Sequence, residues 1–196
     1  MNQENKEDSQ IDLTIVVCTV PNRIAKALDL FLRLSEAAPE NFEILLIGDN
    51  KKRSIGKKRE TGITLAQGKY ITWLDDDDDF TAYTFPEFTK GVASDADVIC
   101  GKSLAILNGK PGFVDFDLDN ENEEFRYNDI TKRLPFPQGC AWKMEIVKNI
   151  QFPDSMYGED WEWAKQALMY VKTQYKTDSV IHIYKHDEKG SEAVYS

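Results

Sequence analysis

Three short apolar runs, separated by two segments with helical periodicity, constrain the fold of this chain more than any other feature. The runs cover residues 13–20, 42–47 and 70–74. They are nearly continuous and rich in β-branched residues, which is typical of strands buried on both faces. Helices are predicted over residues 23–38 and 56–66, the second capped by Gln67-Gly68. This order predicts an α/β protein with a parallel sheet and right-handed crossovers, whose ligands bind beyond the carboxyl ends of the strands.

The second half of the chain shows weaker patterns. Its predicted elements are a hairpin of residues 98–107 and 113–118 with a turn at 108–112, an acidic loop at 119–124, an extended segment at 135–143, a helix at 159–171, a strand at 179–184 and a polar tail at 185–196. One face of that helix carries Trp161, Ala164, Leu168 and Val171. With no internal repeat and no linker, we expect a single domain.

Composition excludes several classes of protein. The 196 residues carry a net charge of −10, so the chain should repel a nucleic-acid polymer. Cys18, Cys100 and Cys140 are too few and too scattered for a disulfide framework or a C-x-x-C zinc site, and we expect buried, reduced thiols. No apolar stretch approaches the roughly 18 residues of a membrane span, and the polar, acidic start lacks the features of a secretion signal. We therefore expect a cytoplasmic protein without a membrane span or a nucleic-acid partner.

Five consecutive aspartates, Asp75 to Asp79, follow the third predicted strand. Neighbouring like charges raise one another's pKa, so such a cluster is costly unless a cation neutralises it. Hard divalent cations favour carboxylate oxygens. A solvated acidic loop is the plainer interpretation of an aspartate run. Its place at a strand end in a β-α-β-α-β segment favours a site for Mg²⁺, Mn²⁺ or Ca²⁺ instead.

Three classes of metal-binding protein use a D-x-D pattern. An EF-hand loop beginning at Asp75 would need glycine at position 80 and glutamate at position 86, and Phe80 and Pro86 exclude it. An aspartyl-phosphate phosphatase would need Thr or Val in place of Asp79 and normally carries the motif on its first strand. That class is weakened but stays open. The third class is the nucleotide-sugar transferases.

Several motifs follow one another along the chain in a characteristic order. They are Thr19-Val20-Pro21-Asn22-Arg23, Gly48-Asp49-Asn50, Gly56-Lys57-Lys58-Arg59-Glu60-Thr61-Gly62, Ala66-Gln67-Gly68-Lys69-Tyr70-Ile71, Leu74-Asp75-Asp76-Asp77-Asp78 and Gly158-Glu159-Asp160-Trp161. Their order and spacing resemble family 2 glycosyltransferases. The resemblance implies a Rossmann-like A-type glycosyltransferase fold, with a mostly parallel central sheet flanked by helices and a smaller mixed acceptor-side region.

The resemblance also implies a domain organisation. A single glycosyltransferase domain would cover residues 11–190, with a nucleotide-binding half at 11–80 and an acceptor-side half at 81–190. We expect a disordered N-terminus at residues 1–10 and a flexible tail at 191–196.

A donor site is implied at the ends of the first three strands. Asp49 would hydrogen-bond the nucleotide base, usually uracil, and Thr19 and Arg23 would line the same pocket. Asp76 would reach the ribose. Asp75 opens the aspartate motif and would bind the donor or its metal directly or through water.

Metal binding and catalysis are implied at three further positions. Asp77 would ligate the metal that bridges the diphosphate, and His186 would lie near it, with His182 as the competing histidine. Asp160, with Glu159 beside it, would be the general base that takes the proton of the acceptor hydroxyl. Acidic residues are also favoured in the first turn of any helix by the macrodipole, which is the plainer interpretation of this pair.

Further candidates rest on weaker signals. Six basic residues at 51–53 and 57–59, Arg59 among them, are candidates for contacting the diphosphate, although a charge run on a helix is usually a solvated face. Gln138-Gly139 is a candidate for lining the acceptor cleft. The tryptophans Trp142, Trp161 and Trp163 are expected to be core residues, with one of them touching ligand.

Elementary chemistry agrees with the resemblance. Displacing a nucleoside diphosphate from an anomeric carbon develops negative charge on the leaving group, which a bound cation neutralises. The acceptor hydroxyl needs a carboxylate base, and one base opposite the leaving group gives inversion in a single step. We therefore expect an inverting glycosyltransferase, dependent on Mn²⁺ or Mg²⁺, that moves one sugar from a nucleotide-diphospho-sugar, with UDP as the expected nucleotide, to a sugar or other hydroxyl acceptor.

Two other functions stay open. One is a phosphoryl- or nucleotidyl-transfer enzyme that uses the aspartate cluster, although residues 18–23 contain none of the glycines of a nucleotidyltransferase loop. The other is a non-catalytic module that binds a nucleotide-sugar.

Overall fold

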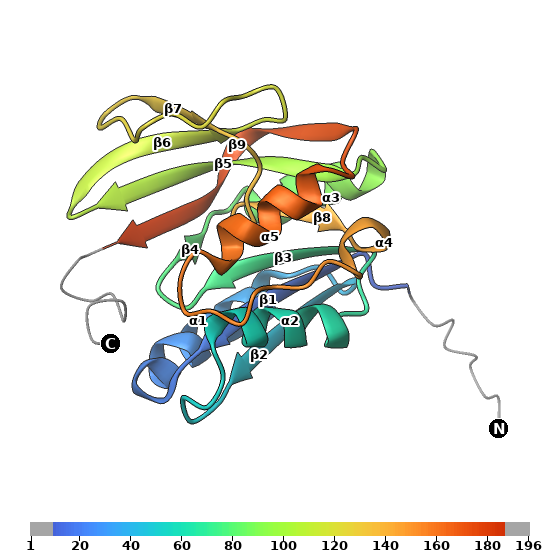
Figure 1. The fold of residues 1–196 in the computed structure, drawn as a ribbon, viewed down its shortest axis with the longest axis vertical. Helices are drawn as coiled ribbons and strands as arrows, with labels where there is room; N and C mark the ends of the chain where they lie inside the picture. Colours follow the sequence, from blue (N-terminus) through green and yellow to red (C-terminus); the bar gives the residue numbers. More distant parts are fainter. Residues whose placement is uncertain (1–9, 187–196) are drawn as a thin grey trace.

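The computed structural model describes residues 10–186, so the predicted termini lie outside the described residues, except for residue 10. Within this range the chain forms one sheet of nine strands with helices packed on it (Figure 1). The strands are β1 (Leu13–Thr19), β2 (Phe42–Gly48), β3 (Tyr70–Asp75), β4 (Asp79–Phe80), β5 (Val98–Leu107), β6 (Lys110–Phe116), β7 (Ile130–Arg133), β8 (Cys140–Lys143) and β9 (Gln174–His186). The helices are η1 (Pro21–Arg23), α1 (Ile24–Ala37), α2 (Ile55–Leu65), α3 (Thr84–Ala93), α4 (Met144–Val147) and α5 (Glu159–Leu168). None of these helices has the length and apolar character that crossing a membrane would demand.

The first three strands form the predicted parallel unit. β1 lies between β2 and β3 and is parallel to both, with Leu13 aligned to Phe42 on one side and to Tyr70 on the other. Because α1 and α2 make the two connections, the predicted β-α-β-α-β order is confirmed. The other strands are mixed in direction: β8 is antiparallel to β3 and β5, and β9 is parallel to β5.

Side chains of β1 alternate between the two faces of the sheet and enter two hydrophobic cores. Leu13, Ile15 and Val17 pack with side chains of α1 and α3. Val16 and Cys18 pack on the other face with side chains of α2, α4 and α5, and Figure 1 shows α5 in front of the sheet. Helices cover both faces, which explains why these strands are nearly continuous apolar runs. All three cysteines are buried free thiols, as predicted.

Four strands end at the same edge of the sheet. Because β8 reverses direction between β3 and β5, both β5 and its parallel neighbour β9 run the same way as β1 and β3. The carboxyl ends of β1, β2, β3 and β9 therefore meet, at Thr19, Gly48, Asp75 and His186. The aspartate run begins at this edge, where parallel sheets bind their ligands.

The helix α3 is not predicted by the sequence patterns. Pro86 and Gly91 lower its helix propensity. In the structure Pro86 lies in the first turn, where its missing N–H costs nothing. Gly91 faces the sheet so closely that a Cβ there would lie 2.7 Å from Cδ1 of Ile99. The helix α3 therefore forms because it packs against the sheet, and not because of the helix propensity of its residues.

The predicted face of α5 coincides only in part with the buried one. Ala164 is fully buried and Leu168 and Val171 pack against the core, but Trp161 does not. The helix ends at Leu168, and it buries Trp163, Ala164 and Ala167, while Trp161 keeps 36% of its surface exposed. Both sets of positions satisfy helical spacing. Trp163 occupies the core because its ring stacks on that of Phe152, with centroids 4.9 Å apart, and the two small alanines let the helix approach the sheet. Trp142 and Trp163 are fully buried, as expected for core residues.

Strand β9 is longer than predicted. It covers Gln174–His186 because it pairs with β5 over most of its length, so Lys185 and His186 belong to a strand and not to the predicted tail. The predicted hairpin is present with a shorter turn. Asn108 and Gly109 alone make it, with φ of 49° and 77°, as a two-residue turn with both central residues at positive φ requires.

The predicted cap of α2 at Gln67-Gly68 is also wrong. The helix ends at Leu65, and the N–H of Ala66 donates to the carbonyl of Gly62. Gly68 instead crosses β1, where a Cβ would lie 2.5 Å from the backbone nitrogen of Thr14. Residue 68 must be glycine because two backbone segments come close together there, and not because it caps the helix in a left-handed conformation.

Candidate active site

An open cleft of about 770 Å³ lies at the edge where the strands end. It is lined by the ends of β1, β3 and β9, the start of α2 and the segment 156–160 that enters α5. Its lining contains the predicted site residues Thr19, Arg23, Arg59, Asp75, Asp76, Asp77, Glu159, Asp160 and His186. The remaining one, Asp49, lies behind the lining residue Lys58 and forms an ion pair with it. The fold thus gathers residues from six separate segments of the chain.

Arg23, at the end of η1, holds two of the aspartates. Its guanidinium forms an ion pair with Asp76 and lies 2.7 Å from Oδ1 of Asp77. The hydroxyl of Thr19 donates to Asp76 at 2.6 Å. Asp76 is 2% exposed, whereas the side chain of Asp77 is 33% exposed. Asp77 is therefore the more accessible carboxylate of the two.

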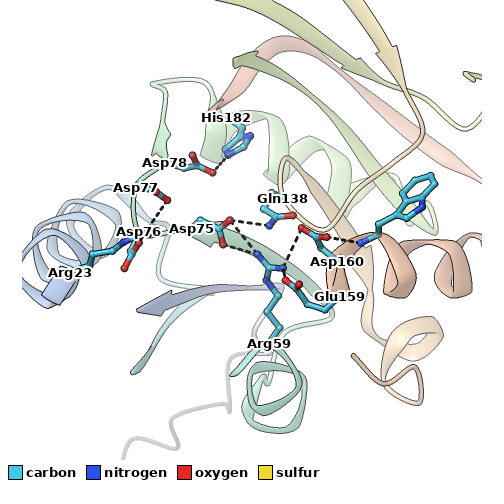
Figure 2. A network of polar contacts seen from close by, with 11 residues as sticks. Arg23, Arg59, Asp75, Asp76, Asp77, Asp78, Gln138, Glu159, Asp160 and His182 are labelled. Carbon is cyan, nitrogen blue, oxygen red and sulfur yellow. Dashed lines mark hydrogen bonds and ion pairs between the residues drawn. The ribbon is translucent and has the colours of Figure 1, made fainter. Parts of the chain in front are cut away.

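Arg59 joins the aspartate run to the start of α5. Figure 2 shows its guanidinium between Asp75 and the Glu159–Asp160 pair. Nη2 lies 2.9 Å from Oδ1 of Asp75, and Nη1 contacts Glu159 and lies 3.5 Å from Oδ2 of Asp160. Gln138 donates to Asp75 from the other side at 3.1 Å. Arg59 is only 3% exposed, which excludes a solvated helix face for this residue.

The charges in this cluster shift one another's pKa. Desolvation works against the charge of Asp75, but Arg59 outweighs it and the pKa of Asp75 is lowered. Burial also works against the charge of Arg59, yet the facing carboxylates raise its pKa. The pKa of Glu159 is raised by burial, which Arg59 only partly offsets. Asp75 and Arg59 are thus a charged pair that the fold stabilises.

The last two aspartates point away from the cleft. Asp78 accepts hydrogen bonds from the backbone N–H of Lys185 at 2.9 Å and lies 3.0 Å from Nε2 of His182 (Figure 2). Asp79 pairs with Arg33 and Lys185 on the surface. His182 is 5% exposed and belongs to this internal cluster, whereas His186 lines the cleft. The structure therefore separates the two competing histidines.

Buried Lys58 and half-buried Asp49 form a second charged pair. Nζ of Lys58 lies 2.9 Å from Oδ1 of Asp49 and donates to the carbonyl of Thr19. Oδ2 of Asp49 accepts from the backbone N–H groups of Lys52 and Arg53. The hydrogen bond from Lys58 lowers the pKa of Asp49 to about 2. The carboxylate that directly follows β2 is therefore ionised and held in place.

Carboxylates of the aspartate run form ion pairs with arginine and lysine side chains of the same chain. Among residues 10–186, no group of three or more His, Cys, Asp or Glu side chains is arranged to hold a metal ion. Arginine and lysine side chains pair with several of these carboxylates and offset part of their repulsion, so the divalent cation stays a prediction. Asp75 and Asp77 nevertheless line the cleft with side chains 29% and 33% exposed. Since Mg²⁺ is commonly held by one or two carboxylates together with substrate phosphates, these residues fit such a cation beside a bound diphosphate.

The prediction from the sequence missed some residues of the cleft and placed another one incorrectly. Gln138 is not part of the cleft lining and holds Asp75 from behind, which corrects the expected acceptor contact. Met156 and Tyr157 line the cleft with exposed side chains, and their place directly before Gly158-Glu159-Asp160 was the available signal. Tyr184 also lines it. Its ring stacks on that of His186, two residues further along the same face of β9.

Solved structures with the same fold include those of TarS from S. aureus. TarS 1-349 in complex with UDP-GlcNAc matches with a TM-score of 0.57 and 13% identity, covering 94% of this chain and 61% of that chain. TarS 1-349 alone matches with a TM-score of 0.55 and 13% identity, covering 89% and 60%. TarS 1-349 in complex with UDP matches with a TM-score of 0.55 and 12% identity, covering 90% and 61%. The present chain thus spans about three fifths of the length of these structures. At this identity the likeness concerns the fold. No curated protein matches the sequence.

A family assignment comes from the sequence itself. The profile of Glycosyl transferase family 2 matches residues 34–144, more than half of the chain. The matched segment contains α2, β3 and the aspartate run. Together with the shared fold, it confirms the predicted A-type glycosyltransferase architecture. The chain therefore belongs to glycosyl transferase family 2.

Proposed function

We propose that this protein is a metal-dependent inverting glycosyltransferase that moves one sugar from a UDP-sugar to an acceptor hydroxyl. One observation carries the proposal. The carboxylates Asp75 and Asp77 at the end of β3 and the carboxylate Asp160 at the start of α5 reach the same cleft. They supply the two functions that the reaction needs, a charged site for the leaving diphosphate and a base for the acceptor.

The donor nucleotide would lie against the ends of β1 and β2. Asp49, kept ionised by Lys58, would accept a hydrogen bond from the base, with Thr19 and Arg23 beside it. Asp76 would bind the ribose. Further basic side chains in the lining, Lys26, Lys51, Arg53 and Lys185, would attract the diphosphate. The complexes of TarS with UDP-GlcNAc and with UDP support a uridine donor.

Asp77, with Asp75 behind it and His186 on β9, would hold a Mn²⁺ or Mg²⁺ ion. When bound, the ion supplies positive charge that stabilises the leaving diphosphate. Arg23 forms an ion pair with Asp77, so the arginine and the metal ion would both contact this carboxylate. Arg23 and Lys185 would add the protein's own positive charge on the diphosphate side of the cleft.

Asp160 would accept the proton of the acceptor hydroxyl. Its side chain is 25% exposed, and Oδ1 accepts the backbone N–H of Trp161 at 2.7 Å, which orients the carboxylate. A single base on one side of the sugar gives inversion at the anomeric carbon. The acceptor, a sugar or another molecule with a hydroxyl group, would contact the exposed side chains of Met156 and Tyr157.

The proposal is tested by the melting temperature of the protein with UDP. UDP should raise it when Mn²⁺ is present, by an amount corresponding to about 2.7 kcal/mol at a hundredfold excess over Kd. Asp77→Ala should abolish this stabilisation, because the cation loses its main ligand. Asp160→Ala should retain it and lose sugar transfer, because the base acts on the acceptor and not on the nucleotide.

Two outcomes would contradict the proposal. Stabilisation by UDP that is undiminished in a chelator would exclude the metal-diphosphate site. Stabilisation by UDP with no release of UDP from any UDP-sugar in a panel would favour a non-catalytic binding module.

A further inference from the structure

The first half of α2 is attached to the segment 152–159 at four points, which we call the α2 seam. The contacts join Ser54 to Asp154, Gly56 to Ser155, Arg59 to Glu159 and Glu60 to the backbone N–H of Phe152. At Gly56 the two backbones approach so closely that a Cβ would clash with the carbonyl of Pro153. The α2 seam therefore fixes the segment that leads into α5, and with it the residues before Asp160.

Arg59 is the buried centre of the α2 seam. It is 3% exposed, and its partner Glu159 is 4% exposed. The same guanidinium reaches Asp75 through Nη2 and Asp160 through Nη1 (Figure 2). It thus contacts one carboxylate on the donor side of the cleft and the neighbouring carboxylate proposed as the base.

We propose that Arg59 and Glu159 are positioning residues that set the distance between the base Asp160 and the donor-side Asp75. This inference rests on the proposed function. Glu159 is too buried to act on an acceptor, but it precedes Asp160 directly in the chain. A shift of about 1 Å in a reacting group can cost about a hundredfold in rate, so a rigid link at this point has catalytic value.

A buried ion pair that only stabilises the fold is the competing explanation. Removing one partner of such a pair leaves a buried charge and destabilises the protein, whereas replacing both by apolar residues of similar size is often neutral. The double variant Arg59→Met/Glu159→Met therefore separates the two explanations. The matched control is Thr64→Met, which changes an exposed side chain of the same helix outside the cleft.

The double variant also removes Arg59 from Asp75, which keeps only Gln138, so its melting temperature should fall, but the folded protein should keep a UDP-induced shift in Mn²⁺. Its kcat for release of UDP from UDP-GlcNAc should fall by about a hundredfold, with a much smaller change in KM. Amide hydrogen exchange at residues 155–160 should become faster, because the α2 seam has lost its buried contact. Thr64→Met should match the wild type in all of these measurements.

Wild-type kcat and wild-type exchange in the folded double variant would overturn the inference, as would an equal loss in Thr64→Met. The exchange measurement needs no activity. If the wild type neither binds UDP nor releases it, the proposed function fails, and exchange at residues 155–160 still decides whether Arg59 and Glu159 hold this segment.

Discussion

Adjacent aspartates in this protein meet different partners because a turn separates them. The N–H of Asp78 donates to the carbonyl of Asp75 at 3.0 Å, so the chain reverses within the run. Asp75, Asp76 and Asp77 line the cleft, and Asp78 points to His182 inside the protein. The run is therefore tolerated because its carboxylates have different surroundings. Arg59 pairs with Asp75, Arg23 is shared by Asp76 and Asp77, Asp79 pairs with Arg33 and Lys185, and Asp78 lies against His182.

The pair of Asp49 and Lys58 gives a prediction at the scale of single residues. Lys58 lowers the pKa of Asp49 from 3.8 to about 2, so ionised Asp49 contributes stability above the higher value, and this stability is lost as the pH falls through the lower one. Asp49→Asn also leaves the buried charge of Lys58 without its carboxylate. The urea midpoints of wild type and variant should therefore differ at neutral pH and converge at a pH of about 2. A difference that does not change with pH would contradict the pair.

At the scale of elements, α5 shows how helical periodicity can be correct while one residue of the expected face, Trp161, stays partly exposed. Positions 161, 164 and 168 and positions 163, 164 and 167 both fit one face of a helix. The sheet selects the second set, since Trp163 fits among Trp73, Trp142 and Phe152. This choice leaves Asp160 facing the cleft at the first turn.

Two tryptophan variants test this face. Trp163→Ala should lower the free energy of unfolding by about 3–5 kcal/mol, because it removes a fully buried ring from the core. Trp161→Ala should lower it by less than about 1 kcal/mol, since that ring is partly exposed. Urea denaturation of the two variants measures both values. Equal losses would show that Trp161 belongs to the core.

At the scale of the whole molecule, both halves of the chain contribute to one sheet. β8, from the second half, lies between β3 and β5, and its Trp142 belongs to the same hydrophobic core as Val16 of β1. Neither half can bury its apolar strands without the other. A single domain over residues 11–190 stays a prediction, and this shared sheet within residues 10–186 is the reason to test it.

The shared sheet predicts one cooperative unfolding transition. Far-UV circular dichroism, which reports on all strands and helices, and tryptophan fluorescence, which reports on the core, should give the same urea midpoint. The residue 11–80 segment expressed alone should not fold, because β3 would lose β8 and its core partners. Two separated midpoints would instead indicate two domains.

Much of the site was predictable because it depends on local patterns. The apolar runs identify β1, β2 and β3, the turn residues mark their ends, and parallel strands bring those ends to one edge. Asp49, Asp75 and Asp160 could therefore be named as candidates before any contact was known. The helix α3 and the full length of β9 could not be predicted, because packing on the sheet stabilises α3 and pairing with β5 extends β9.

By itself the sequence determined the parallel unit, the edge at which ligands bind and the residue types available there. Only the tertiary structure decided which partner each charge has. Arg59 meets Glu159 across 100 positions of the chain, and Asp78 meets His182 across 104. Such pairs leave no periodic trace in the sequence, because their energy depends on burial and distance, and both exist only once the sheet and its helices have packed.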